Sequence, residues 1–332
     1  MTLPVLFVFG ILVLALLETP LFTVIAGLSV VCLYFVDYDF LAIQTIIIEM
    51  NRLTAMPVLV ALPLFTFTGC LLTETRAPRR IMNFMQAVLG WLPGGLAMAS
   101  LCACAFFTAL TGASGVTIVA LGSVLYPILR QHGYHEKFTL GLLTTSGSLG
   151  LLFPPSLPII LYGVVARVDI RKIFTAALFP GILLVLVLSV YAFWTARPGR
   201  ASRKAGPPAD PVSWRTVRQT FRQGIWDWPI IGILLVGVYG GVVTIAEVSA
   251  VVLVYVVVVE CLVLKEVDLI RQVPQIIIES TILSGAIIVI LGMALGFTGF
   301  LVDAQIPGRI LTFLTGLTGN RLVFLGGLNL FL

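Results

Sequence analysis

Long runs of apolar residues, separated by short polar stretches, fill most of the 332-residue chain. The runs cover residues 3–17, 20–36, 54–73, 94–108, 113–129, 138–152, 156–166, 173–195, 229–243, 248–264, 276–302 and 321–332. Many reach the roughly 17–25 residues of a membrane-spanning helix, and they lack the alternation of membrane strands. The pattern predicts an all-α polytopic membrane protein. It leaves open whether Glu18-Thr19-Pro20 turns between two short spans or kinks one long span.

Two of these apolar stretches are interrupted by residues that break helices. Thr111-Gly112-Ala113-Ser114-Gly115 divides residues 92–129, and Phe153-Pro154-Pro155-Ser156 divides residues 138–166. Backbone groups at membrane depth must be paired, buried in protein or face a cavity. We therefore expect a re-entrant helical hairpin and a broken helix whose ends face a buried site, as in ion-coupled transporters.

The composition agrees with a membrane protein and excludes several other classes. The chain is 59% hydrophobic and 11% charged, whereas a soluble domain carries about 25% charged residues. The net charge of +5 comes from the loops and does not indicate a nucleic-acid partner. The sequence has no HExxH motif or paired aspartates at membrane depth, so we do not expect an enzyme. Its five cysteines lack zinc-site spacing, so no cofactor or metal other than a coupling ion is expected.

The distribution of basic residues predicts the orientation in the membrane. In the predicted linker at residues 196–228, the stretch 196–225 carries seven cations and one acid, Asp210, so the positive-inside rule places the linker in the cytoplasm. The cations are Arg197, Arg200, Arg203, Lys204, Arg215, Arg218 and Arg222. Counting back through the spans also places Arg76, Arg79 and Arg80 inside. The loop at residues 167–172, predicted to lie outside, is basic too.

Residues 75–90 have the pattern of an amphipathic helix. Thr75 can cap it, Pro78 suits its first turn, and Gly90 suits its end. Its apolar stripe consists of Ile81, Phe84, Met85, Val88 and Leu89. The helix either lies along the membrane interface or acts as a mechanical arm that holds the hairpin.

The chain contains an internal repeat. A shift of 229 residues aligns Pro78-Arg79-Arg80-Ile81 with Pro307-Gly308-Arg309-Ile310, and a shift of 230 aligns residues 46–49 with 276–279. We therefore expect a first repeat at residues 1–195 and an incomplete second repeat at residues 229–332, of opposite orientation. The second copies of the two breaks would lie near positions 340–344 and 382–385, beyond Leu332. This arithmetic predicts a C-terminally truncated sequence.

Several segments together resemble the large membrane subunit of tripartite ATP-independent periplasmic (TRAP) transporters. They are Leu62-Pro63-Leu64-Phe65, the stretch from Leu92-Pro93-Gly94-Gly95, the break at 111–115, Gly133-Tyr134, Gly147-Ser148-Leu149-Gly150, Pro154-Pro155-Ser156-Leu157-Pro158, Tyr162-Gly163 and residues 237–247. The chain departs from the family pattern at Ala113, where a hydroxyl is usual, and at Ala246, where a proline is usual.

The resemblance implies an inverted-repeat, elevator-type secondary transporter in the bacterial inner membrane. It implies sodium-driven uptake of an organic acid, such as a dicarboxylate, keto acid or sugar acid. It also implies two partners besides the lipid bilayer: a small membrane subunit and a periplasmic substrate-binding protein. The alternatives are a self-sufficient dicarboxylate or citrate elevator transporter and a non-transporting, truncated assembly subunit.

The two breaks contain the candidate site residues. Sodium is a hard cation that prefers oxygen ligands, and the end of a helix offers unpaired carbonyls. The candidate sodium ligands are Thr111, Gly112, Ser114, Ser146, Ser148 and Pro154, with unwound backbone expected at residues 146–148 and 153–156. The candidate substrate-binding residues are Ser114, Gly115, Pro155 and Ser156, where restarting half-helices present free N–H groups to a carboxylate. The alternative is that these small residues only let helices pack closely.

Three further polar features have simpler interpretations. Glu247 is expected to cap or brace the start of a helix, and Glu260 to lie near the interface beside Lys265 and Glu266. Residues 214–228 suit either a helix on the membrane surface or a contact with the small subunit, and we favour the surface helix.

Overall fold

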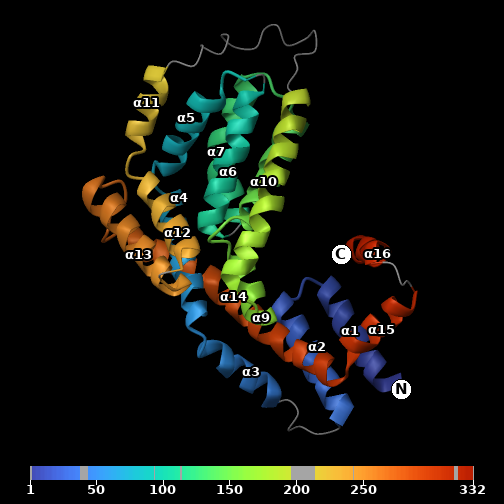
Figure 1. The fold of residues 1–332 in the computed structure, drawn as a ribbon. Helices are drawn as coiled ribbons and strands as arrows, with labels where there is room; N and C mark the ends of the chain where they lie inside the picture. The colour runs from blue at the N-terminus through green and yellow to red at the C-terminus, as the bar shows by residue number, and fades with distance from the viewer. Residues whose placement is uncertain are drawn as a thin grey trace. The chain divides into compact units, whose positions relative to one another are not determined.

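The computed structural model describes residues 2–37, 44–92, 94–112, 114–195, 214–241, 243–317 and 321–331. In these ranges the regular structure is entirely helical (Figure 1). Most of the predicted linker, with Arg197, Arg200, Arg203, Lys204 and Asp210, lies outside the described residues. The chain divides into two compact units, Met1–Met56 with Ala286–Leu332, and Pro57–Gly285.

The helices follow one another along the chain with short connections. They are α1 (Thr2–Leu16), α2 (Leu21–Asp37), α3 (Gln44–Thr54), η2 (Pro57–Val60), α4 (Ala61–Thr73), α5 (Ala77–Leu89), α6 (Gly95–Thr111), α7 (Ser114–Gln131), α8 (Glu136–Leu149), η3 (Gly150–Leu152), α9 (Leu157–Ala166), α10 (Ile170–Thr195), α11 (Trp214–Gln223), α12 (Trp228–Gly240), α13 (Ile245–Val257), η4 (Val258–Val263), α14 (Gln272–Asp303), α15 (Ile306–Leu317) and α16 (Arg321–Phe331).

The first unit contains α1, α2, α3, the later part of α14, α15 and α16. The chain turns between α1 and α2 at Glu18, whose φ of 64° lies in the left-handed region, and the two helices pack against each other. This resolves the ambiguity at residues 18–20 in favour of two helices. Ser29 of α2 donates a hydrogen bond of 3.3 Å to the carbonyl of Met293 in α14.

The second unit is built around α6. This helix packs against α4, α5, α7, α8 and α10, and 14 of its 17 residues are buried. Its alanines and glycine have little side-chain volume, so neighbouring helices can approach its backbone closely. Figure 1 shows α6 and α7 side by side, with α10 running alongside α6.

Three described helical segments are long and apolar enough to cross a membrane: Ile170–Thr195, Ile245–Val263 and Gln272–Asp303. Two helix pairs interrupted by a short break also qualify by length and composition, Ile46–Thr54 with Pro57–Thr73 and Glu136–Leu152 with Leu157–Ala166, and the second of these is bent by 44°. The predicted all-α polytopic membrane protein is thus confirmed at the level of helix content and apolar length. The second pair is the broken helix predicted at residues 138–166.

Candidate ion and substrate site

The first break joins α6 to α7 through Gly112 and Ala113. Gly112 has a φ of 65°, a left-handed conformation that only glycine adopts without strain, and its N–H donates to the Thr108 carbonyl at 2.8 Å. This bond closes the last turn of α6 in the manner of a glycine C-cap. The helix therefore ends where the sequence predicted, and its final carbonyls have no following turn to pair with.

The second break separates α8 from α9. The single turn η3 follows α8, and the chain then becomes extended at Phe153, with φ −104° and ψ 145°. Pro154 and Pro155 have no N–H to donate, so they cannot continue the helical hydrogen bonds. Helix resumes at Leu157, and Ser156 occupies the N-cap position.

The structure brings the two breaks together. A Cβ added to Gly112 would overlap the side chain of Leu157, the first residue of α9. A Cβ at Gly150 would overlap the backbone of α6 at Ala105 and Ala109, and the Thr108 side chain. The hairpin tip thus lies directly against the start of the second half-helix, and glycine permits both approaches.

Four hydroxyl groups lie buried near this contact. Thr111 and Thr117 hydrogen-bond to each other through their hydroxyls at 2.8 Å, and they are 1% and 0% exposed. Thr108 and Ser156 are also fully buried, and neither hydroxyl has a hydrogen-bond partner in the described part of the protein. A buried hydroxyl without a partner is costly, so these two oxygens are suited to a ligand.

The serines on α8 do not follow the prediction of unwound chain at residues 146–148. Ser146 and Ser148 lie within regular helix, because α8 continues to Leu149. Ser146 is buried and donates its hydroxyl to the Leu143 carbonyl at 3.0 Å, whereas Ser148 is exposed. The expected unwinding is wrong because Gly147 serves packing here: a Cβ at this position would overlap Ile118 of α7.

The remaining predicted residues are distributed around the two breaks. Ser114 is half-buried at the first position of α7, and Pro155 is buried beside Ser156. Pro154 lines an apolar cavity of about 270 Å³ together with residues of α6, α10 and α12. Gly115 is exposed and does not line that cavity.

Gly115 instead lines a second hollow, of about 770 Å³. Its wall also includes Glu74, Arg79, Ser123 and Glu279, from the end of α4 and from α5, α7 and α14. Ser156 lines neither this hollow nor the apolar cavity beside Pro154.

A second buried polar cluster surrounds Arg80 of α5. Its guanidinium donates to Asp227 at 2.8 and 3.0 Å, to Glu260 at 2.7 Å and to Glu266 at 2.6 Å. Glu266 also accepts from the Arg76 backbone N–H at 2.6 Å. Glu260 lies beside Glu266, as expected, and it is buried in the protein: it is 1% exposed, and its Oε2 has no partner in the described residues.

The charges of the three carboxylates act on Arg80. Burial alone lowers the pKa of the guanidinium, but the hydrogen bond and charge of Asp227, with the charges of Glu260 and Glu266, raise this pKa above its ordinary value. Arg80 therefore stays protonated. Burial raises the pKa of Asp227 above its ordinary value against the lowering effect of Arg80, and the charge of Glu266 raises this pKa further.

Two sets of buried polar residues were not predicted from the sequence: the Thr108 and Thr117 hydroxyls, and the partners of Arg80. The Thr108 and Thr117 hydroxyls belong to the site. Thr108 lies three residues before Thr111 on α6, and Thr117 lies six residues after it on α7, so a helical projection of each half of the hairpin could have suggested them. The partners of Arg80 are 147–186 residues away along the chain, so no local pattern identifies them. Among the described residues, no group of three or more His, Cys, Asp or Glu side chains is placed to hold a metal ion.

Comparison with known proteins identifies the family. Residues 8–332 match the family described as tripartite ATP-independent periplasmic transporter, DctM component. The chain belongs to this family. The resemblance inferred from the breaks and their neighbours is thereby confirmed, and a DctM component is a transporter permease, not a class of enzyme.

Curated DctM-type relatives are similar over most of the chain. The ectoine/5-hydroxyectoine TRAP transporter large permease protein of Ruegeria pomeroyi is 32% identical over 76% of this chain and 58% of its own length. The isethionate TRAP transporter permease protein of Oleidesulfovibrio alaskensis is 30% identical over 86% of this chain and 44% of its own length. The C4-dicarboxylate TRAP transporter large permease protein of Pseudomonas aeruginosa is 31% identical over 88% of this chain and 67% of its own length. The chain thus spans about half to two thirds of the length of these relatives.

Proposed function

We propose that this DctM-family chain is the large permease subunit of a sodium-coupled transporter for a small organic oxyanion. The three relatives named above are called transporters of ectoine, isethionate and C4-dicarboxylates. These compounds differ in their carbon skeletons, but each carries a carboxylate or sulfonate group. An organic acid of this kind is the proposed substrate class, and the bacterial inner membrane is the proposed location.

The observation that carries this proposal is the meeting of the two helix breaks beside unpartnered buried hydroxyls. Thr108 and Ser156 offer neutral oxygens at that contact. Sodium, like other hard cations, prefers such oxygens, and the carbonyls at the C-terminal end of α6 add partial negative charge. The residues present therefore fit a sodium ion, whose charge would favour an anionic substrate nearby.

The half-helices supply the complementary part of the proposed site. The N-termini of α7 and α9 present free N–H groups and the positive end of the helix dipole, which suits a carboxylate or sulfonate. Ser114 and Ser156 stand at these two starts. Pro154 and Pro155 keep the second break from closing into helix.

An inverted repeat and an elevator motion are also part of the proposal. In support, α5 and α15 begin 229 residues apart, the same shift that aligns their sequences. In this proposal α5 is the arm beside the hairpin, and it packs against α6. A small membrane subunit and a periplasmic binding protein are the proposed partners, and genes for both beside this one would support them.

Uptake by intact cells tests the proposal. The chain is expressed with its proposed partner proteins, and uptake of labelled C4-dicarboxylate, isethionate and ectoine is measured against sodium concentration. Thr108→Val and Ser156→Ala should each raise the sodium concentration needed for half-maximal uptake by roughly tenfold, which is about 1.4 kcal/mol. The double variant Thr111→Ala/Ser114→Ala should act in the same direction.

Ser123→Ala is the matched control. Its hydroxyl lies on α7 but is exposed and donates to the Ala120 carbonyl at 2.8 Å. This variant should keep the wild-type sodium requirement. If the Thr108 and Ser156 variants retain it as well, sodium does not bind at the meeting of the breaks. Uptake that needs no sodium at all would overturn the coupling.

A further inference from the structure

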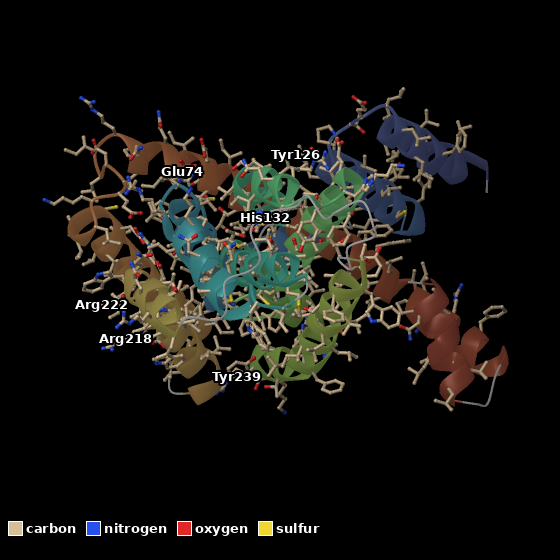
Figure 2. The ribbon with its side chains drawn as sticks, turned by 90° about the horizontal axis from the view of Figure 1, so that it is seen from above. Glu74, Tyr126, His132, Arg218, Arg222 and Tyr239 are labelled. Carbon is tan, nitrogen blue, oxygen red and sulfur yellow. The ribbon has the colours of Figure 1, made fainter. Side chains whose placement is uncertain are left out.

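Helix α11 presents three arginines on one face. Arg215, Arg218 and Arg222 are spaced by three and four residues, so they fall within one side of the helix. All three are exposed, and no described carboxylate lies within ion-pairing distance of any of them. Figure 2 shows Arg218 and Arg222 near each other, projecting outward at the edge of the ribbon.

The three arginines lie around one depression of the surface. Together with Gln219 and Gln223 they line a shallow depression of about 330 Å³. Arginine binds phosphate oxygens in bidentate fashion through its planar guanidinium, and glutamine amides can donate to the same oxygens. The lining chemistry therefore suits a phosphate monoester or diester.

An adjacent side of the same helix is aromatic. Phe221 stacks on Trp228 of α12 with ring centroids 5.2 Å apart, and it contacts Phe84 of α5 at 5.9 Å. These contacts hold α11 against α5 and α12. Trp214 and Trp226 remain 78% and 42% exposed.

This arrangement is that of a helix lying in a membrane interface. Tryptophan is enriched at the level of the lipid headgroups, and arginines beside an apolar face extend toward the phosphates. The positive-inside rule predicts that α11 lies on the cytoplasmic side, and anionic lipids attract basic segments at a membrane surface.

We propose that the Arg215–Arg218–Arg222 face of α11 is a binding site for the headgroup of an anionic phospholipid. The lipid phosphate and its net negative charge complement the three guanidinium groups, which have no ion-pair partner among the described residues. The tryptophans beside them fix the depth of the helix in the interface. This site is separate from the two helix breaks and does not depend on the function proposed for them.

Native mass spectrometry of the purified full chain tests this site. The protein in uncharged detergent is titrated with dioctanoyl phosphatidylglycerol or dioctanoyl phosphatidylcholine, and the fraction that retains lipid is measured. The wild type should retain the anionic lipid in preference. Arg215→Gln/Arg218→Gln/Arg222→Gln should lose at least about tenfold in affinity for it, since one arginine near an anionic surface contributes about fivefold.

Arg167→Gln/Arg171→Gln/Lys172→Gln is the charge-matched control. It removes three exposed cations from the loop predicted to lie on the opposite side of the membrane. This control variant should retain the wild-type preference for the anionic lipid. Equal losses in both triple variants would show that net charge alone attracts the lipid, and full retention by the α11 variant would also overturn the site.

Two further arms separate the lipid from other ligands. Free glycerol 3-phosphate at matched concentration should not displace the lipid, and displacement would show a site for small anions instead. If the α11 variant keeps its lipid but loses a co-purifying membrane protein, the face binds a protein partner and the lipid proposal fails. Should the glutamine variant not fold, Arg215→Lys/Arg218→Lys/Arg222→Lys keeps the charge but loses the bidentate hydrogen bonds, so it should bind the anionic lipid more weakly than the wild type. Unchanged affinity of this variant would overturn the guanidinium site.

Discussion

Arg80 Nη2 lies 2.7 Å from Glu260 Oε1, although the two residues are 180 positions apart in the chain. The arginine comes from the amphipathic helix α5, and the glutamate from the π-helical segment η4. Asp227 and Glu266 bind the same guanidinium. The contact therefore ties α5 to three later parts of the chain within one unit.

Removing the Arg80 cation from this cluster should strongly lower the stability of the protein. Arg80→Met leaves the buried carboxylates of Asp227 and Glu260, and the partly exposed Glu266, without their shared partner, and breaking a buried ion pair in this way costs about 3–5 kcal/mol. We expect a clear fall in the midpoint of thermal unfolding, followed by size-exclusion fluorescence in detergent. Glu260→Gln keeps an oxygen acceptor and leaves Arg80 two carboxylates, so its effect should be much smaller. Equal effects would mean that the cluster does not act as one charged unit.

The close approach of Gly112 to Leu157 should make these positions interdependent. Gly112→Ala places a Cβ where Leu157 lies, at a backbone φ of 65°. The conformation alone costs roughly 1–2 kcal/mol and the overlap about 1–3 kcal/mol more. The variant should therefore unfold at lower temperature. Adding Leu157→Ala should recover part of the overlap, and a double-mutant cycle without such coupling would contradict the contact.

Gly69 offers a matched pair with Gly122 for testing helix packing. A Cβ at Gly69 of α4 would overlap the backbone of Thr111, whereas Gly122 of α7 has no atom within 4 Å. Gly69→Ala should destabilise the protein and displace the hairpin tip. Gly122→Ala should be neutral or raise stability by about 0.5–1 kcal/mol, because alanine favours helix. Thermal unfolding of both variants, side by side, gives the comparison.

The capping box at the start of α13 makes a smaller, local prediction. Glu247 accepts from the Thr244 N–H at 2.6 Å, and Thr244 Oγ1 accepts from the Glu247 N–H at 3.3 Å. Thr244→Ala should lower stability by about 0.5–2 kcal/mol. Glu247→Gln keeps an acceptor at the third helical position and should lose less. A Thr244→Ala variant as stable as the wild type would show that α13 is held by packing alone.

The sequence predicted the features that depend on local chemistry. Glycine at position 112 and the proline pair at 154–155 indicate helix breaks directly, because one permits a left-handed turn and the others remove donors. Likewise, the expectation that Glu247 caps a helix is confirmed, because a capping box lies within four consecutive residues. The turn between α1 and α2 could not be predicted, since an interrupted apolar run fits two spans or a kink.

Features that depend on packing were harder to predict. Residues 146–148 were expected to unwind, but helix continues through Gly147 because its missing side chain admits Ile118 of a neighbouring helix. Glycine at a helix crossing and glycine at a helix break look alike in one sequence. Glu260 and Glu266 were expected near each other, but the arginine that binds both lies 180 and 186 residues away along the chain, so no local pattern indicated it.

The long sequence separations around Arg80 also bear on how the protein is made. A ribosome synthesises Arg80 of α5 147 residues before Asp227 and 186 residues before Glu266. Until those acids emerge, the arginine of α5 lacks its counter-charges, although the helix can already pack on α6, which ends at Thr111. The cluster can form only once the chain through Glu266 has been translated. Neutralisation of Arg80 is thus a late event in the biogenesis of the protein, and it follows the packing of α5 on α6.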